Sequence, residues 1–459
     1  MSNMHAHVSH SVKLPERKTL IVGLGKTGLS CARYLAAQGF QVAITDTRDN
    51  PPELARLREE LPDAALFLGG FRPEIFAVAE QLVVSPGVPL TDPLVRLALD
   101  RGVPVLGDIE LFARVAQAPV VAVTGSNGKS TVVTLLGEMA QDAGLRAGVG
   151  GNLGEPALDL LNSRNRLYML ELSSFQLETT HSLQARAAVV LNLSPDHMDR
   201  YPSLDAYGAA KARIYQGAEW AVVNRDDPSV PPMAVGAGHQ VGFTLGRPEG
   251  RDFGIQTRDG QPWLAQGDQF LLPAGLLLIP GRHNLANALA ALALGDAAGL
   301  PMESMLGTLR QFRGLPHRTQ WVAEKRGVRW YNDSKGTNVG ATLAALEGLH
   351  QPGTPGRALL IAGGDGKGAD FSSLAPVVER TCKAVLLIGR DAPLMAEVLA
   401  GRAPLVQLPS LNAAVLKAAQ LAEAGDYVLL SPACASFDMF RGFEHRGQAF
   451  VEAVGRLPA

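Results

Sequence analysis

The sequence predicts an α/β protein of three domains in which most strands lie parallel. Two observations predict this class. Apolar strand-like runs alternate with helix-like segments along the chain, an order typical of parallel strands joined by crossover helices. The chain also has 459 residues, too many for one compact core, since about 150 residues per domain is usual.

The strand-like runs form three series with a break between each pair. The first series ends near Gly107, and Gly314-Leu-Pro-His-Arg318 suggests a hinge before the third. We therefore expect domains at 1–107, 108–314 and 315–459, with residues 1–18 as a disordered polar tail. In order, the runs are 19–22, 41–45 and 82–85, then 120–123, 167–172 and 187–193, and finally 328–332, 358–362, 384–388 and 427–430.

Composition favours small-molecule partners and a reducing compartment. Lys and Arg number 42 against 44 Asp and Glu, and no run of like charges indicates nucleic acid. Cys31, Cys382 and Cys434 are widely spaced, which argues against a disulfide framework. The longest apolar run, 270–280, contains proline and glycine and is far shorter than the ~20 residues of a bilayer span. We expect a cytoplasmic protein without a membrane segment that acts as a monomer.

A glycine-rich turn follows the first strand run. Gly23-Leu-Gly-Lys-Thr-Gly28 opens a helix, and Asp46 ends the next strand, which is the fingerprint of a Rossmann-like dinucleotide domain. Such a turn recognises phosphate and not nicotinamide, so NAD(P) and another nucleotide are both possible ligands. Ser85-Pro-Gly87 ends a further strand at the same carboxyl edge. A second nucleotide loop in the next domain favours a non-redox nucleotide here.

That second loop is Thr124-Gly-Ser-Asn-Gly-Lys-Ser-Thr131, which follows an apolar strand. Backbone N–H groups freed by the glycines can surround phosphate oxygens, Lys129 can reach a β- or γ-phosphate, and Ser130 is placed to meet Mg²⁺. Val123 stands where the common motif has a glycine, so the loop is a variant. It predicts an enzyme that uses ATP, against the alternative of an ordinary strand-to-helix corner.

Three polar residues of the middle domain follow its strands or occupy its helices. Glu171 ends an apolar strand, where a magnesium carboxylate of a nucleotide-hydrolysing domain is expected. His197 lies after the next strand, where a ligand role and a structural role are equally favoured. Lys211, in a helical segment, is by default a solvated lysine.

Further polar pairs and loops complete the pattern. Asn284 and Asn287 share one face at the start of an Ala- and Leu-rich helix, where they suit a purine edge or a helix cap. In the third domain the segments 333–337, 363–367 and 431–436 are polar or glycine-rich and all follow predicted strands. Three such strand ends on one sheet edge predict a second substrate pocket.

Taken together, five segments resemble the Mur ligases of bacterial cell-wall synthesis, and the resemblance extends from about Leu20 to Phe450. These segments are Thr124–Thr131, Glu171–Glu178, Asp196–Tyr201, Asn332–Lys335 and Ser431–Asp438. Val123 is normal for that family, whereas Lys26 and Gly336 stand where some members have other residues. The resemblance implies a Rossmann-like N-terminal domain, a central P-loop ATPase-type domain and a Rossmann-like C-terminal domain.

The activity that the resemblance implies is ATP-dependent addition of D-glutamate to UDP-N-acetylmuramoyl-L-alanine through an acyl phosphate, in peptidoglycan precursor synthesis. It implies two Mg²⁺ sites, held by Ser130, Glu171, His197 and Lys211, the last as a carbamate formed with CO₂. A plain ammonium there would repel the metal. The implied catalytic residues are Lys129, Asn152, His197 and Lys211.

The resemblance also implies three ligand sites. ATP contacts are Gly125, Ser126, Asn127, Gly128, Lys129, Ser130, Thr131, Asn284, Asn287, Arg318, Asp333 and Lys335. The UDP precursor contacts are Lys26, Thr27, Asp46, Thr47, Arg48, Ser85, Pro86, Gly87, Asn152, Gln176 and His197. The D-glutamate contacts are Thr337, Lys367, Ser436 and Phe443, with Lys367 pairing the side-chain carboxylate.

Two other classes compete with this interpretation. Folate polyglutamylating ligases share the central and C-terminal plan but lack a glycine-fingerprint domain at the N-terminus, so Gly23 to Asp46 argues against them. A dehydrogenase or an NAD-sensing protein would explain the first domain and leave Lys129 and Glu171 without a role. Nucleotide-dependent phosphate release separates these classes.

Overall fold

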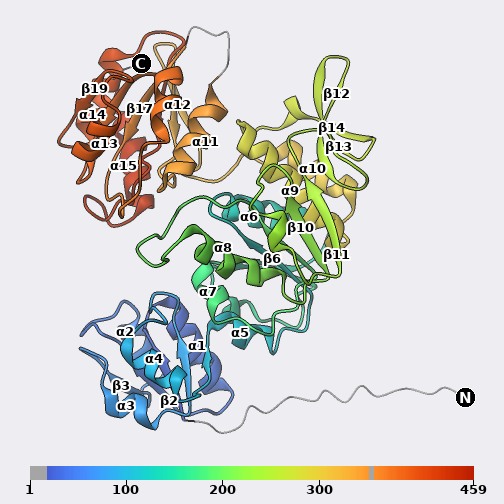
Figure 1. Cartoon of the computed structure of the whole chain (residues 1–459), viewed down its shortest axis with the longest axis vertical. Coiled ribbons are helices and arrows are strands. Elements are labelled where there is room, and N and C mark those ends of the chain that lie inside the picture. The colour runs from blue at the N-terminus through green and yellow to red at the C-terminus, as the bar shows by residue number, and fades with distance from the viewer. Residues whose placement is uncertain (1–17, 153, 351–355, 459) are drawn as a thin grey trace, which may run out of the picture. The chain divides into compact units, whose positions relative to one another are not determined.

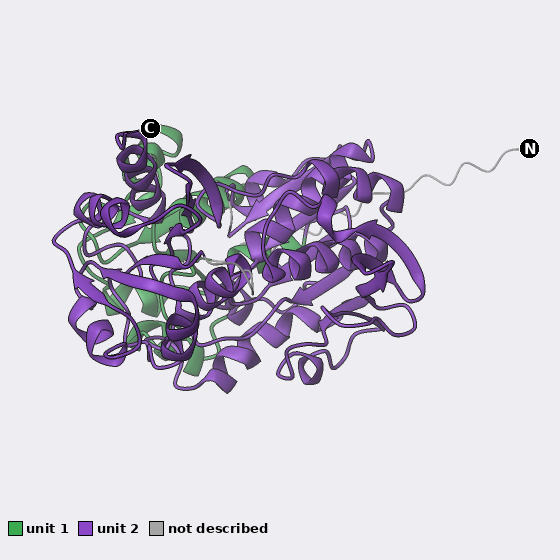
Figure 2. Ribbon diagram, turned by 90° about the horizontal axis from the view of Figure 1, so that it is seen from above, with its two compact units in different colours: residues 1–114 green, residues 115–459 purple. Residues whose placement is uncertain are grey.

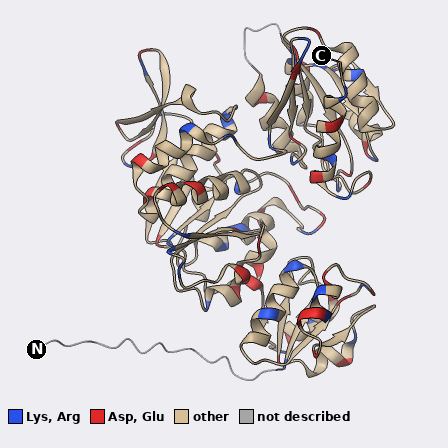
Figure 3. Cartoon of the chain, turned by 180° about the vertical axis from the view of Figure 1, so that it is seen from behind, with Lys and Arg blue, Asp and Glu red and all other residues tan. Residues whose placement is uncertain are grey.

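The computed structural model describes residues 18–152, 154–350 and 356–458, and it divides into two compact units, residues 1–114 and 115–459 (Figures 1 and 2). The tail predicted at 1–18 lies outside the described residues except for Lys18. Figure 3 shows Lys and Arg residues interspersed with Asp and Glu residues along the chain. None of the described helices combines the length and the apolarity that crossing a membrane requires. All three cysteines are buried, and none of them forms a disulfide.

The first unit is a five-stranded parallel sheet with strand order β3-β2-β1-β4-β5. Its central strand is a run of four buried residues, Thr19–Val22, as a sheet covered on both faces requires. The elements are β1 (Thr19–Val22), α1 (Lys26–Ala37), β2 (Val42–Thr45), α2 (Leu54–Glu60), β3 (Ala65–Phe67), α3 (Pro73–Val78), β4 (Gln81–Val84), α4 (Pro93–Asp100), β5 (Val105–Leu106) and α5 (Asp108–Ala113).

The second unit begins with a nine-stranded sheet of order β14-β13-β12-β11-β10-β9-β6-β8-β7. Six strands are parallel to their neighbours, and β12, β13 and β14 form an antiparallel edge. Its strands are β6 (Val120–Thr124), β7 (Ala147–Gly151), β8 (Leu167–Glu171), β9 (Ala187–Val190), β10 (Trp220–Asn224), β11 (His239–Phe243), β12 (Phe253–Arg258), β13 (Gln261–Gln266) and β14 (Gln269–Pro273).

Helices α6 and α9 pack together within a core cluster of this sheet. Helix α9 carries alanine and leucine around most of its circumference, so most of its residues are buried. The helices are α6 (Lys129–Asp142), α7 (Ser174–Glu178), α8 (Leu204–Ala212), α9 (Arg282–Ala298) and α10 (Met302–Gln311), with short 3₁₀ turns at Ala157–Leu160, Arg213–Tyr215, Pro231–Met233 and Ala274–Leu276.

The remainder of the second unit is a six-stranded sheet of order β15-β16-β20-β17-β18-β19, parallel except for the β15–β16 pair. Apolar clusters lie on both of its faces. Its elements are β15 (Gln320–Lys325), β16 (Val328–Asn332), α11 (Val339–Leu349), β17 (Ala358–Ala362), α12 (Leu374–Thr381), β18 (Cys382–Leu387), α13 (Ala392–Val398), β19 (Leu405–Gln407), α14 (Leu411–Leu421), β20 (Tyr427–Leu430) and α15 (Phe443–Gly455). The predicted α/β class with mostly parallel sheets is confirmed.

Candidate active site

The loop between β6 and α6 is shaped by glycine and anchored by the segment after β9. Gly128 has φ +86°, and a Cβ there would lie 2.5 Å from Oδ1 of Asn287, so the position requires glycine. The Ser126 amide donates to the Asn192 carbonyl at 3.0 Å, and the Asn127 amide donates to Asn192 Oδ1 at 2.9 Å. These two hydrogen bonds fix the backbone of the loop in the conformation that leads into α6.

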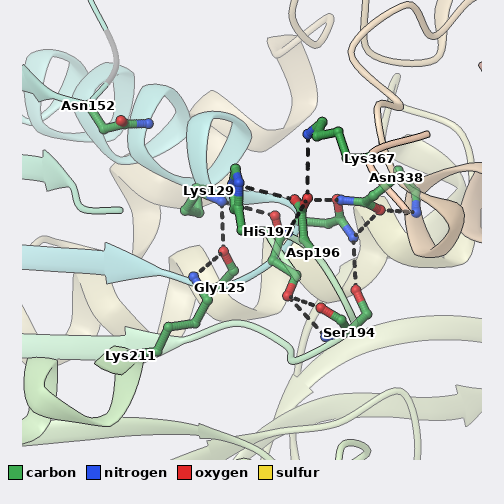
Figure 4. Close-up of polar contacts among 12 residues, drawn as sticks. Gly125, Lys129, Asn152, Ser194, Asp196, His197, Lys211, Asn338 and Lys367 are labelled. Atoms are coloured by element: carbon green, nitrogen blue, oxygen red, sulfur yellow. Dashed lines mark hydrogen bonds and ion pairs between the residues drawn. The ribbon is translucent and has the colours of Figure 1, made fainter. Parts of the chain in front are cut away.

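Two lysine ammonium groups point at this loop (Figure 4). Lys129 Nζ donates to the carbonyl oxygens of Gly125 at 2.7 Å and Ser126 at 2.9 Å. Lys211 Nζ donates to the same Gly125 oxygen at 3.0 Å and lies 4.5 Å from the ring centroid of Tyr207. Removal from water lowers the pKa of both lysines. The neighbouring charge of Lys129 lowers the pKa of Lys211 further.

The default expectation that Lys211 is a solvated lysine is wrong. Its exposed fraction is 1 % because α8 turns this residue toward the end of β6, where Thr124 Oγ1 lies 3.4 Å from Nζ. No carboxylate in the described part of the chain lies within 4.0 Å of Nζ. Burial and the neighbouring charge of Lys129 therefore favour the neutral amine of Lys211 over its ammonium form.

Glu171, at the end of β8, is the hub of a buried polar cluster. Its Oε2 accepts from Ser130 Oγ at 2.7 Å, and its Oε1 accepts from Asn152 Nδ2 at 2.7 Å. Arg318 Nη2 donates to Ser130 Oγ at 2.7 Å from far along the sequence. Burial would raise the pKa of Glu171, but the charge of Lys129 and these hydrogen bonds outweigh it and lower that pKa. Glu171 is therefore an ionised carboxylate next to a hydroxyl, a donor set that suits Mg²⁺.

A cavity of about 300 Å³ lies beside the loop. Asn284 and Asn287 are paired in its wall, because Asn287 Nδ2 donates to Asn284 Oδ1 at 3.2 Å. The capping alternative for them is wrong, since the cap of α9 is Gly281 and carries no side-chain bond. The predicted ATP residues that line this cavity are Asn127, Gly128, Thr131, Asn284, Asn287, Arg318, Asp333 and Lys335.

Two charged groups of the cavity have displaced pKa values. Burial raises the pKa of Asp333 to about 6, although Ser431 Oγ donates to it at 2.7 Å and the Thr319 amide at 3.0 Å. Burial lowers the pKa of Lys335 to about 8, and its Nζ lies 3.8 Å from the centroid of the Phe443 ring. An anion bound in the cavity would therefore raise the pKa of Lys335 and increase the protonated fraction of its amine.

His197 lies in the loop after β9 with a left-handed backbone, φ +57°. The centroid of its ring lies 4.9 Å from that of Phe175, in an edge-on arrangement. Burial lowers the pKa of His197, although the charge of Asp196 acts to raise it. Asp196 was not among the predicted site residues. It receives Asn338 Nδ2 at 3.1 Å and pairs with Lys367 Nζ at 3.8 Å (Figure 4). The sequence signal for Asp196 was its place beside His197 in the segment Asp196–Tyr201. The only sequence signal for Asn338 was that it follows Thr337.

Arg446 of α15 joins the loops that are predicted to form the D-glutamate pocket. Its guanidinium donates to the carbonyls of Ser334 at 2.9 Å, Cys434 at 3.1 Å and Ala435 at 3.3 Å. Asp365 and Ala435 exchange backbone hydrogen bonds. The loops that follow β16, β17 and β20 are therefore tied together, and they carry Thr337, Lys367, Ser436 and, at the start of α15, Phe443.

In the first unit, the predicted precursor residues follow the carboxyl ends of β1, β2 and β4. Asp46 Oδ2 accepts from the Leu24 amide at 2.7 Å and from Arg48 Nη2 at 2.7 Å. Ser85 Oγ donates to the Gly23 carbonyl at 2.8 Å. The residues that share this edge are Lys26, Thr27, Asp46, Thr47, Arg48, Ser85, Pro86 and Gly87.

Gln176 has a structural partner of its own. It forms a capping box with Ser173 at the start of α7: Ser173 donates its amide to Gln176 Oε1 at 3.1 Å, and the Gln176 amide donates to Ser173 Oγ at 3.2 Å. Asn152, Gln176 and His197 lie in the second unit, so their contact with a precursor stays a prediction.

Comparison with known proteins gives one consistent result. Family models match residues 17–107 (Mur ligase MurD-like, N-terminal domain), 123–295 (Mur ligase middle domain) and 317–434 (Mur ligase, glutamate ligase domain). The chain is 58 % identical over 440 residues to the UDP-N-acetylmuramoylalanine--D-glutamate ligase of Nitrosococcus oceani, covering 96 % of each chain. It is 54 % identical over 450 residues to the same-named ligase of Pseudomonas putida, covering 98 % of this chain and 100 % of the other.

Solved structures resemble the fold at low sequence identity. MurF from Acinetobacter baumannii aligns with a TM-score of 0.61 at 18 % identity, over 95 % of this chain and 90 % of that one. UDP-N-acetylmuramate-alanine ligase MurC from Thermotoga maritima aligns with a TM-score of 0.59 at 18 % identity, over 95 % and 98 % of the two chains. These likenesses concern the fold alone.

Proposed function

This chain belongs to the Mur ligase family, and on that premise we propose that it joins D-glutamate to UDP-N-acetylmuramoyl-L-alanine with ATP, a step of peptidoglycan precursor synthesis. A carboxylate oxygen of the precursor attacks the γ-phosphorus of ATP, and ADP leaves. The D-glutamate nitrogen then attacks the acyl carbon of the acyl phosphate, loses a proton and displaces inorganic phosphate. Phosphorylation is needed because a free carboxylate is a poor acyl donor.

One observation carries the proposal: Lys367, from the third predicted domain, lies 3.8 Å from Asp196, next to the phosphate-loop region of the central domain. A cation that suits an amino-acid carboxylate thus stands beside the place where a γ-phosphate would be activated. Neither a dehydrogenase nor an NAD sensor requires this arrangement.

The phosphorylation step depends on Lys129. Its ammonium now contacts the Gly125 and Ser126 carbonyls. We expect it to exchange these partners for phosphate oxygens, where a fixed cation stabilises the charge that develops during transfer. Asn284, Asn287, Arg318, Asp333 and Lys335 would hold the adenosine and phosphates in the adjoining cavity.

The donor set fits Mg²⁺. Ser130 and the ionised Glu171 would hold one ion, and His197 with Lys211 the second; within the described residues no three His, Cys, Asp or Glu side chains form a metal site by themselves. Such a centre would rely on substrate phosphates and water for its other ligands, as Mg²⁺ usually does. When bound, the metal neutralises phosphate charge.

Carbamylation of Lys211 is supported by its surroundings. Two ammonium groups on the single Gly125 carbonyl repel each other, so the neutral form of Lys211 is favoured. The neutral Nζ can attack the carbon of CO₂ and release one proton, which leaves a carboxylate on nitrogen. That carboxylate replaces a repelled cation by an oxygen donor.

The amino-acid step would use Thr337, Lys367, Ser436 and Phe443, and the precursor would bind the first unit at Lys26, Thr27, Asp46, Thr47, Arg48, Ser85, Pro86 and Gly87. This assigns residues 1–107 to the precursor, 108–314 to ATP and 315–459 to the amino acid. We infer that the enzyme works as a monomer in the cytoplasm; the absence of disulfides among the three cysteines suits a reducing compartment.

A phosphate-release assay tests the proposal. Purified protein with Mg²⁺, ATP and UDP-N-acetylmuramoyl-L-alanine is given D-glutamate, L-glutamate, meso-diaminopimelate or L-lysine in separate reactions. Release is expected with D-glutamate and near background with the other three. Release with L-lysine or meso-diaminopimelate would favour another Mur-type ligase, and release with a folate acceptor and L-glutamate a folate polyglutamylating ligase. Turnover with NAD⁺ and a reduced substrate, but none with ATP, would contradict the ligase assignment.

A further inference from the structure

Asn338 occupies the residue between the predicted amino-acid pocket and helix α11. It is the N-cap of α11, where its Oδ1 accepts from the Ala341 amide at 2.9 Å. Only 7 % of the residue is exposed. A cap needs just this one acceptor, and serine or aspartate would provide it equally well. The amide nitrogen is therefore free for a different task.

That nitrogen contacts two residues of the central domain (Figure 4). Asn338 Nδ2 donates to Asn127 Oδ1 at 3.1 Å and to Asp196 Oδ2 at 3.1 Å, and Asn127 Nδ2 donates back to Asn338 Oδ1 at 3.3 Å. We call this set, Asn338 with Asn127 and Asp196, the amide bridge. It joins residues 142 and 211 positions apart in the sequence.

Both ends of the amide bridge lead to groups with roles in the proposed reaction. Asn127 belongs to the phosphate loop, and its main chain is tied to Asn192 in both directions, at 2.9 and 3.2 Å. Asp196 offers its other oxygen, Oδ1, to the His197 amide at 2.9 Å and to Lys367 Nζ at 3.8 Å. Asn338 thus holds one oxygen of the Asp196 carboxylate while the other oxygen faces Lys367.

We propose that Asn338 is a positioning residue that, through the amide bridge, holds the phosphate loop and the Asp196–Lys367 pair in register and so sets the affinity for both nucleotide and amino acid. The inference rests on the proposed function in its second half, because Lys367 is assigned there to the D-glutamate carboxylate. Without the amide nitrogen, Asp196 can rotate fully toward Lys367 and compete with the substrate carboxylate for that cation.

The test compares three variants. Asn338→Ser keeps the acceptor that caps α11 and removes Nδ2. Asn338→Asp keeps shape and cap but places an oxygen against the Asp196 carboxylate. Ser410→Ala removes the matching cap of α14, where Ser410 Oγ accepts from the Ala413 amide at 3.2 Å far from the bridge. It therefore reports what cap loss alone does.

For Asn338→Ser we expect the KM for D-glutamate to rise about tenfold or more, kcat to change less than about threefold, and the Kd of Mg-ADP, measured by calorimetry, to rise about threefold. Asn338→Asp should raise both constants further. Ser410→Ala should leave both unchanged while lowering Tm. Wild-type KM and Kd values for Asn338→Ser would overturn the proposal and leave Asn338 as a helix cap only.

The two proposals fail in different ways. If the wild-type chain releases no phosphate with the precursor and D-glutamate, the proposed function is wrong. In that case the Mg-ADP arm still decides on the amide bridge, because it needs no second substrate. An unchanged Mg-ADP Kd in Asn338→Ser would then overturn it.

Discussion

The chain contains two glycine-rich turns that lead from a strand into a helix, and they are filled by opposite charges. In the first unit, the turn at Gly23–Gly28 holds the Asp46 carboxylate, which accepts from the Leu24 amide at 2.7 Å. In the second unit, the loop at Gly125–Gly128 contacts the Nζ atoms of Lys129 and Lys211. Similar local sequences thus present a carboxylate in one place and lysine nitrogens in the other.

This difference indicates different ligand groups. At the first turn the Asp46 carboxylate, paired with Arg48, suits a hydroxyl or an N–H group of a nucleotide. At the second turn the Lys129 ammonium suits a polyphosphate. The glycines are shared because both turns need close backbone approach: a Cβ at Gly28 would collide with the Gly23 carbonyl, and one at Gly128 would meet Asn287. Glycine sets the turn, and the charged neighbour sets the ligand.

The largest expected effect is a difference between Lys129 and Lys26, which are the first residues of helices α6 and α1. Lys129→Ala should lower kcat in the phosphate-release assay by roughly 10³-fold or more, because it removes the cation from the developing phosphoryl charge. Lys26→Ala is the matched control, since Lys26 is likewise the first residue of a helix after a glycine, α1, but is exposed. It should raise only the precursor KM, by less than about tenfold. A loss below about tenfold for Lys129→Ala would show that the loop does not hold the reacting phosphate.

The next effect concerns Lys211, the second lysine at that loop. Lys211→Ala should lower turnover by at least ~10²-fold while Mg-ADP binding and Tm stay close to wild type, because the lost group is a metal ligand. Acetate or formate should restore part of the rate by supplying a carboxylate oxygen, and chloride at equal ionic strength should not. If the variant keeps more than half of the wild-type rate, the carbamate proposal is wrong.

A smaller effect tests the acceptor at the first turn. Asp46→Asn keeps an oxygen for the Leu24 amide but weakens the pairing with Arg48, whose Nε lies 2.8 Å from Asp46 Oδ1. We expect the precursor KM to rise about tenfold, with the KM for ATP unchanged. An equal rise in both KM values would contradict the assignment of this turn to the precursor.

The smallest effect is a difference in pH dependence of stability. Asp333 has its pKa raised from 3.8 to about 6 by burial, so its stabilising contribution is present below pH 4 and lost as pH rises through about 6, up to about 3 kcal/mol. Asp46 is the opposite case: its pKa is lowered below 3.8, so its contribution is present above that pH and lost as pH falls further.

Urea unfolding from pH 3 to 7 checks this contrast. Asp333→Asn should flatten the stability curve between about pH 4 and 6. Asp46→Asn should lower stability by a constant amount above about pH 4 and change the slope of the curve only below it. The same curve for wild type and Asp333→Asn would show that the Asp333 pKa is not raised.

The sequence predicted the central parallel strands because a strand covered on both faces is one continuous apolar run, as at β6 and β17. It missed β3, β5, β7, β10, β11 and β19, and also β12, β13, β14 and β15. In several of these, such as β3 and β12, exposed residues interrupt the apolar run. The loop residues 125–131 and Glu171 were predicted because their spacing along the chain is local. The burial of Lys211 and the contacts of Asn338 with Asn127 and Asp196 depend on distant segments, which no local pattern encodes.

Because the pKa of Lys335 is lowered to about 8, nucleotide binding is expected to be coupled to proton uptake. Phosphate placed in the cavity raises that pKa, so near pH 8 the complex takes up a fraction of a proton from the solvent. The measured enthalpy of ADP binding should therefore vary with the ionisation heat of the buffer, and affinity should decline as the solution becomes more alkaline. The Phe443 ring, 3.8 Å from Nζ, stabilises the protonated form and so helps to set this uptake of protons.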